Sequence, residues 1–129
     1  MVIRYLDTSA AMKLIVDEAE SAALAEYLVS APEDSLVASW LLFTELHCAA
    51  STNSSSLPIE AVSAVLDAVA LVDLRRADLI SAAAISGLRL QDAIHLACAI
   101  RLQVDRVITY DQEMASAAER LGLRAESPR

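Results

Sequence analysis

The sequence predicts an α/β fold, in which helices cover both faces of a parallel sheet of four or five strands and the first strand is central. Short apolar runs alternate with helical segments along the whole chain, and this order is typical of parallel sheets. The composition agrees, because 56% of the residues are hydrophobic and only two are glycine, which favours a helix-rich globule. At 129 residues, the chain is expected to form one domain over residues 1–129.

Five apolar segments are expected to form the strands. The first, residues 2–6, is rich in β-branched and aromatic side chains and is followed by Asp7, Thr8 and Ser9. Ligand sites in open α/β sheets form at the carboxyl ends of the strands, so Asp7 lies at a candidate site. The later strands are expected at residues 35–39, 70–74, 106–110 and, at one edge, 123–125.

Helices are expected between these strands. Residues 17–29 have apolar side chains at helical spacing and acids in the first turn, where the helix macrodipole favours them. Gly87 and Gly122 follow two of the helical segments and suit the left-handed capping position. Residues 51–56 are interpreted as a hydroxyl-rich loop. The other helices are expected at residues 10–16, 40–50, 59–68, 75–86, 92–102 and 112–121.

The formal net charge of −8 argues against a protein that reads duplex grooves with a basic face. A polyanionic substrate would need metal ions, local basic residues or a partner to offset repulsion. The chain starts with a strand instead of a signal peptide, and no apolar run approaches the ~20 residues of a membrane span. We therefore expect a cytoplasmic protein with no membrane partner. Cys48 and Cys98 lie in apolar helical stretches and are expected to be buried thiols.

Four acids from distant parts of the chain are expected to face one cleft. Asp7 and Asp111 each follow a strand. Asp92 opens the helix before the fourth strand, and Glu45 lies in the second turn of the helix after the second strand. Strand ends and the starts of the following helices share one rim of a parallel sheet. Crowded carboxylates repel one another unless a cation or a proton lies between them, so this pattern predicts a metal site.

A ligand set made only of oxygen atoms suits Mg²⁺, with Mn²⁺ as a possible substitute. Three hydroxyl side chains near the acids are expected to hold metal-bound waters, namely Thr8, Ser9 and Thr109. A metal ion held in this way lowers the pKa of a bound water and stabilises charge on a phosphodiester. The chain contains only His47 and His95 as histidines, and no Ser-His-Asp triad is compelling.

Each acid also has a simpler interpretation. Asp7, Asp92 and Asp111 all lie at helix starts, where a carboxylate is favourable without any metal. Glu45 is harder to explain in this way, because a carboxylate on an apolar helix usually has a partner or a metal. His95 lies one turn after Asp92, so an Asp–His zinc site is an alternative to a packed or hydrogen-bonded histidine.

Four segments stand out as an ordered set, namely residues 5–10, residues 37–39 with Glu45, residues 88–97 and residues 107–111. Together they resemble the PIN-domain ribonucleases, and among them the VapC-type toxins of bacterial toxin–antitoxin pairs. The resemblance implies a PIN-like three-layer α/β/α sandwich and Mg²⁺-dependent endonucleolytic cleavage of RNA. It also implies a homodimer and a cognate antitoxin whose C-terminal segment enters the active-site groove. The family's acidic quartet, with catalytic and metal-binding roles, falls on Asp7, Glu45, Asp92 and Asp111.

Other functions fit the sequence less well. A receiver domain needs adjacent acids after the first strand, but Leu6 precedes Asp7. A phosphatase of the Asp-x-Asp kind is excluded because Ser9 occupies the place of the second acid. A catalytically silent interaction module on the same scaffold remains the alternative function. The basic residues near the expected site that are available to hold RNA are Lys13, Arg75, Arg76 and Arg89.

Overall fold

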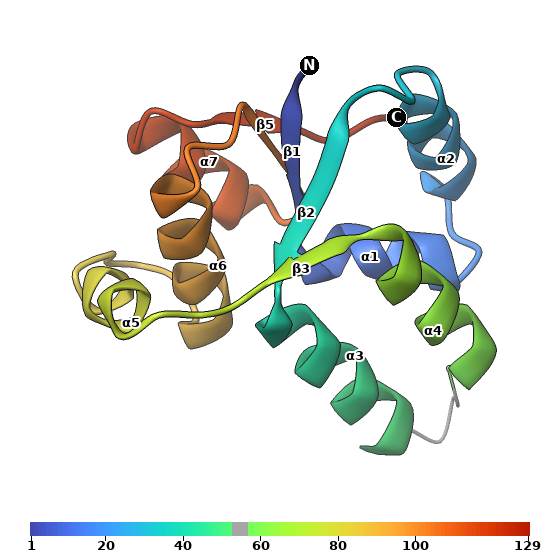
Figure 1. Ribbon diagram of the computed structural model, residues 1–129, viewed down its shortest axis with the longest axis horizontal. Coiled ribbons are helices and arrows are strands. Elements are labelled where there is room, and N and C mark those ends of the chain that lie inside the picture. Colours follow the sequence, from blue (N-terminus) through green and yellow to red (C-terminus); the bar gives the residue numbers. More distant parts are fainter. Residues whose placement is uncertain (53–56) are drawn as a thin grey trace.

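The computed structural model describes residues 1–52 and 57–129, in which helices surround one five-stranded sheet (Figure 1). The strands are β1 (Ile3–Leu6), β2 (Ser35–Ser39), β3 (Ala70–Val72), β4 (Arg106–Ile108) and β5 (Arg124–Glu126). The helices are α1 (Thr8–Ile15), α2 (Ser21–Val29), α3 (Trp40–Thr52), α4 (Ile59–Ala68), α5 (Arg76–Ala83), α6 (Leu90–Arg101) and α7 (Gln112–Arg120). Within the described ranges, no helix combines the length and the apolar character that a membrane crossing requires.

All neighbouring strands run parallel, in the order β3-β2-β1-β4-β5. The strand β1 is therefore central, which confirms the sequence prediction. Asp7 extends β1 by one step, because its backbone N–H donates to the carbonyl of Ile108 over 3.2 Å. The carboxyl ends of the strands share one edge of the sheet, and Asp7 lies at the middle of that edge.

Apolar layers on both faces of the sheet bury the last three residues of β1. Successive side chains of a strand point to opposite faces. Tyr5 accordingly packs with residues of α6 and α7, whereas Leu6 packs with residues of α1, α2, α3 and α4. Figure 1 shows α6 and α7 on one side of the strands and α1, α2 and α4 on the other. The three-layer α/β/α arrangement is thus confirmed.

A buried ion pair attaches α5 to α6. The carboxylate of Asp78 is 1% exposed and accepts hydrogen bonds from Arg101, at 2.7 Å from Nε and 3.0 Å from Nη2. It also accepts the backbone N–H of Arg75 at 2.9 Å, just before α5 begins. The guanidinium of Arg101 reaches further to the carbonyl of Asp73 at 3.0 Å. One carboxylate therefore both caps α5 and fixes this helix to its neighbour.

Several helix boundaries differ from those expected, and two of these differences correct an interpretation of the sequence. The helix α2 begins at Ser21 and not at residue 17, so the acids before it do not form its first turn. Instead, Glu20 and Glu18 turn toward Lys13, at 2.6 Å and 3.5 Å from its Nζ. The helix α3 continues to Thr52, so the expected loop at 51–56 is wrong for its first two residues. Residues 53–56 of that loop lie outside the described residues.

The two glycines that were expected to cap helices, Gly87 and Gly122, have different roles in the structure. Gly122 follows α7 with φ +87°, and the N–H of Leu123 donates to the carbonyl of Ala118 at 2.9 Å, so its capping role is confirmed. The helix α5 ends at Ala83, four residues before Gly87, which has φ +82° in the following turn. The predicted direct cap of α5 by Gly87 is therefore wrong.

The two cysteines are free but differ in burial. Cys98 is buried, as expected. Cys48 is exposed, which corrects the expectation of a buried thiol. It lies on the outward side of α3, whereas Leu42 and Leu46 make the buried side of that helix. An apolar stretch does not by itself show which residues of a helix face the core.

Candidate active site

The four acids singled out in the sequence all line one cavity of about 280 Å³. Asp7 ends β1, Glu45 lies in the second turn of α3, Asp92 in the first turn of α6, and Asp111 precedes α7. Segments from four distant parts of the chain therefore converge at the carboxyl edge of the sheet. The cavity is also lined by Thr8, Ser9, Met12, Arg89 and Gln91.

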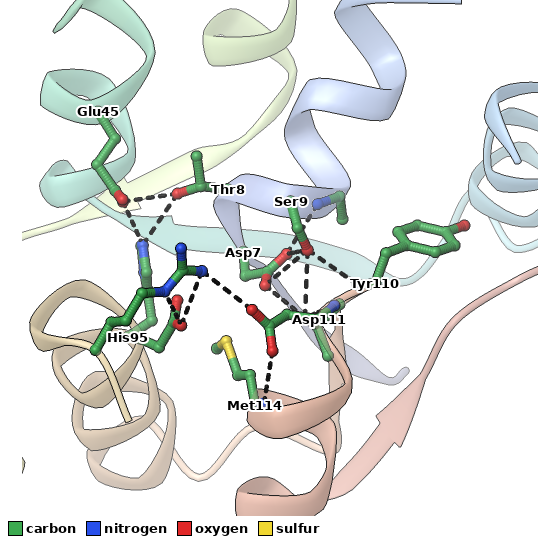
Figure 2. A network of polar contacts seen from close by, with 12 residues as sticks. Asp7, Thr8, Ser9, Glu45, His95, Tyr110, Asp111 and Met114 are labelled. Carbon is green, nitrogen blue, oxygen red and sulfur yellow. Dashed lines mark hydrogen bonds and ion pairs between the residues drawn. The ribbon is translucent and has the colours of Figure 1, made fainter. Parts of the chain in front are cut away.

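Asp7 is the most buried of these acids, with 2% of its surface exposed. Its Oδ1 accepts the backbone N–H of Ala10 at 2.8 Å, so Asp7 caps α1 as well as facing the cavity. Its Oδ1 also accepts from the hydroxyl of Ser9 at 2.8 Å (Figure 2). Its Oδ2 accepts from the hydroxyl of Thr109 at 2.5 Å. Burial raises the pKa of Asp7, and the bonds from Thr109, Ala10 and Ser9 partly oppose that rise.

Two hydroxyls connect the end of β1 to the end of β4. Thr109 donates to Asp7 while its Oγ1 accepts the backbone N–H of Asp111 at 3.1 Å. Ser9 donates to Asp7 while its Oγ accepts the backbone N–H of Tyr110 at 2.9 Å. Figure 2 shows Ser9 between Asp7 and Tyr110. These hydroxyls fix the position of Asp7 relative to Asp111, and their predicted contact with metal-bound water remains a prediction.

Glu45 has a chain of partners that the sequence analysis did not identify. Its Oε1 lies 2.6 Å from the hydroxyl of Thr8 and 2.6 Å from Nε2 of His95 (Figure 2). The other ring nitrogen of His95, Nδ1, lies 2.7 Å from the hydroxyl of Tyr5. Burial raises the pKa of Glu45, but the bond and charge of His95 and the bond from Thr8 outweigh it and hold the pKa below its usual range.

The two ring nitrogens of His95 contact different side chains, Nδ1 that of Tyr5 and Nε2 that of Glu45. Burial strongly raises the pKa of Tyr5, which keeps the phenol protonated and able to donate to Nδ1. The carboxylate of Glu45 can only accept, so the hydrogen bond at 2.6 Å places a proton on Nε2 of His95. The packed, hydrogen-bonded interpretation of His95 is confirmed, since its side chain is 1% exposed and both ring nitrogens have partners.

Arg89 bridges the remaining two acids. Its Nη2 lies 3.2 Å from Oδ2 of Asp92 and 3.0 Å from Oδ2 of Asp111. The other oxygen of Asp111 accepts the backbone N–H of Met114 at 3.0 Å and caps α7. Burial raises the pKa of Asp92, and the charge of Asp111 adds to this rise while Arg89 opposes it. Asp7 and Asp111 are therefore confirmed as N-caps, and both also line the cavity.

The donor chemistry of this cavity fits a hard divalent cation, because the acids and hydroxyls that line it offer only oxygen atoms. Among the described residues, no three or more His, Cys, Asp or Glu side chains are positioned together as ligands of one metal ion. Each acid instead has an internal partner, described above. A zinc site at Asp92 and His95 has no support, because the ring of His95 turns to Tyr5 and Glu45.

The basic residues expected near the site are only partly brought there. Arg89 lines the cavity, whereas Lys13 bonds to Glu20 at 2.6 Å. Arg75 and Arg76 are not among the residues that line the cavity. The contribution of Tyr5 was missed, although its place two residues before Asp7 on a buried strand was visible in the sequence.

Comparison with known proteins places this arrangement in a family. The PIN-domain family model matches residues 4–120, and the chain belongs to the PIN-domain family. Within that family it is similar to ribonuclease VapC46 of Mycobacterium tuberculosis, with 40% identity over 131 residues that cover 99% of each chain.

Solved structures share the fold. VapBC-1 from nontypeable Haemophilus influenzae matches with a TM-score of 0.75 at 18% identity, over 98% of both chains. A toxin–antitoxin complex from Klebsiella pneumoniae matches with a TM-score of 0.70 at 17% identity, again over 98% of both chains. These likenesses confirm the PIN-like sandwich that the sequence predicts.

Proposed function

We propose that this chain is a Mg²⁺-dependent endoribonuclease that acts as the toxin of a type II toxin–antitoxin pair. One observation carries the proposal: four carboxylates from distant segments line a single cavity. Such a group is costly to assemble unless a cation is to be bound there. The ribonuclease name of VapC46, which shares 40% of its residues with this chain, supports RNA as the substrate.

We assign the following roles to the residues of the site. When bound, the metal would supply an activated water and positive charge for hydrolysis of a phosphodiester bond. Asp7, Glu45, Asp92 and Asp111 would hold it, with Mn²⁺ as a possible substitute for Mg²⁺. The hydroxyl of Thr109 keeps Asp7 in place. His95 orients Glu45.

Cleavage of a total small-RNA pool tests this proposal. The purified protein is incubated with Mg²⁺, with Mn²⁺ or with a chelator, beside the Asp7→Asn variant. Asp67→Asn is the matched control, because Asp67 is an exposed residue of α4 and does not line the cavity. We expect metal-dependent cuts at discrete sites in the wild type and in Asp67→Asn, and none in Asp7→Asn.

A catalytically silent interaction module is the alternative, and the same experiment separates it from the enzyme. Cleavage by Asp7→Asn at the wild-type rate would remove Asp7 from the mechanism. Absence of cleavage with either metal favours the silent module, provided that the protein is pure. Mass spectrometry of the same sample decides this, because a bound inhibitor adds its own mass to the 13.8 kDa chain.

We also propose a cognate antitoxin whose C-terminal segment enters the acidic cavity, and a homodimeric, cytoplasmic toxin. The toxin–antitoxin complex from Klebsiella pneumoniae supports the partner, because its fold matches this chain over 98% of its length. A basic side chain of the antitoxin would complement the acids of the cavity. Failure to recover an inhibitory partner in a pull-down, together with harmless overexpression, would contradict the toxin assignment. Light scattering of the purified chain tests the dimer.

A further inference from the structure

Arg89 contributes the cationic group among the residues that line the acidic cavity. Its guanidinium bridges Asp92 and Asp111, with Nη2 3.2 Å and 3.0 Å from their carboxylate oxygens. A further bond of 3.2 Å joins its Nε to Asp92. The side chain of Arg89 is nevertheless 74% exposed, whereas those of Asp92 and Asp111 are 14% and 23% exposed.

The partners of the four acids differ in how easily they can leave. Asp7 is held by Ser9, Thr109 and the backbone of α1, all of which are fixed parts of the fold. Asp92 and Asp111 are instead neutralised by a long and exposed side chain. An exposed ion pair of this kind is worth little and breaks readily. Arg89 is therefore the partner that can move without disturbing the fold.

We propose that Arg89 exchanges partners: it bridges Asp92 and Asp111 in the metal-free protein, leaves them when a divalent cation binds, and then holds a backbone phosphate of the RNA. This inference rests on the proposed function, since it needs both a metal and an RNA substrate. Arg89 acts in it first as an internal counter-ion and then as a substrate-positioning residue.

Charge explains the direction of the exchange. A divalent cation between two carboxylates gains more attraction than a guanidinium does, and Arg89 cannot stay beside it without repulsion. The released guanidinium has a planar fork of donors that matches the oxygens of a phosphate. The chain has a net charge of −8, so a cation at the mouth of the cavity is needed where the RNA backbone enters.

Two binding measurements with opposite expected signs test the exchange. The variants are Arg89→Gln, which removes the charge, and Arg89→Lys, which keeps the charge but loses the fork. Arg120→Gln is the matched control, because Arg120 is exposed at the end of α7, does not line the cavity and changes the net charge equally. Mn²⁺ binding is measured by calorimetry. RNA binding is measured by anisotropy with a fluorescein-labelled single-stranded RNA of mixed sequence in Ca²⁺, with the integrity of the RNA checked on a gel.

For Arg89→Gln we expect the Kd for Mn²⁺ to fall roughly three- to tenfold, as the loss of a competing ion pair predicts. We expect its Kd for RNA to rise roughly tenfold, as the loss of a charged hydrogen bond to phosphate predicts. Arg89→Lys should lie between this variant and the wild type in both measurements, and Arg120→Gln should match the wild type in both. A residue that only supports the fold would weaken both interactions together.

The outcomes also separate this inference from the function on which it rests. If the wild type binds Mn²⁺ and cleaves RNA but Arg89→Gln has an unchanged or higher Kd for Mn²⁺, the counter-ion role is overturned. If its Kd for RNA is unchanged, the phosphate role is overturned. If neither the wild type nor Arg89→Gln binds Mn²⁺, the proposed metal-dependent function is itself wrong.

Discussion

The Nε2 of His95 lies 2.6 Å from Oε1 of Glu45. On its other side, the imidazole ring of His95 packs against Tyr5 and hydrogen-bonds to the Tyr5 hydroxyl. The contact between His95 and Glu45 joins the second turn of α3 to the middle of α6, across 50 residues of sequence. It explains how an acid on an apolar helix keeps a single direction. Glu45 points into the cavity because a fully buried ring holds one of its oxygens.

Replacing His95 by Gln is expected to lower RNA cleavage roughly 10–100-fold, the usual effect of losing a residue that orients a metal ligand. The Kd for Mn²⁺ should rise in parallel, because the flexible amide that replaces the buried ring no longer fixes the direction of Glu45. Initial cleavage rates and calorimetry are the measurements, with circular dichroism to show that the fold persists.

Tyr5→Phe tests the outer end of the same chain of hydrogen bonds. Its loss of a buried donor to Nδ1 should cost about 1 kcal/mol of unfolding free energy and reduce cleavage less than His95→Gln does. Tyr27→Phe is the control, because its hydroxyl bonds to Glu126, away from the cavity. Equal cleavage by Tyr5→Phe and the wild type would show that the phenol plays no part in orienting Glu45.

Asp7→Asn is expected to raise the stability of the metal-free protein, because the buried carboxylate has a raised pKa and an amide avoids the cost of burying charge. The amide oxygen can still cap α1. Asp7→Ala loses the cap and is expected to lower the unfolding free energy by about 1–2 kcal/mol. Urea unfolding in chelator measures both variants, and a destabilised Asp7→Asn would contradict the expectation.

The same variant makes a prediction about pH. Folding raises the pKa of Asp7, so the native state binds this proton more tightly than the unfolded state does. The stability that this proton binding contributes is full at low pH and is lost as the pH rises through the folded pKa. The stability gain of Asp7→Asn over the wild type should therefore be small below about pH 4, near the unfolded pKa, and increase as the pH is raised. Unfolding curves at a series of pH values test this, and a gain that does not vary with pH would refute it.

Asp78→Ala is expected to lower the unfolding free energy by about 2–4 kcal/mol, because it leaves the guanidinium of Arg101 without its buried partner. The start of α5 also loses the acceptor for the N–H of Arg75. Asp67→Ala provides the comparison at an exposed helical position, where an effect within about 0.5 kcal/mol is expected. Similar unfolding midpoints for the two variants would show that the ion pair contributes nothing net.

Gly122→Ala should cost about 1 kcal/mol, because a side chain is disfavoured at its φ of +87°. No atom lies within 4 Å of an added Cβ, so the cost comes from the backbone alone. Gly122→Asn is expected to be milder, since asparagine tolerates the left-handed region better than alanine does. Thermal unfolding of the two variants checks the order.

The parallel sheet and the meeting of the four acids were predictable because both follow from topology. Apolar runs alternate with helices, and the ends of parallel strands share one edge. This is sufficient to bring Asp7 and Asp111 together without any knowledge of side-chain rotamers. Glu45 was also recognisable, because an acid in an apolar helix needs a partner.

The partners of the acids were not predictable in the same way. The contact of Arg89 with Asp111 depends on the direction of a long flexible side chain, and that of Tyr5 with His95 joins residues 90 positions apart. The start of α2 was mispredicted because acids favour a first helical turn, but here Lys13 binds Glu20 just outside the helix. Tertiary contacts override local preference in each case.

The hydroxyl of Thr109 that holds Asp7 belongs to a segment near the end of the 129-residue chain. A ribosome must therefore release β4, Thr109 and Asp111 before Asp7 acquires this partner and the four acids can meet. Under the proposed function, an unfinished polypeptide carries only part of the acid set and cannot cut RNA.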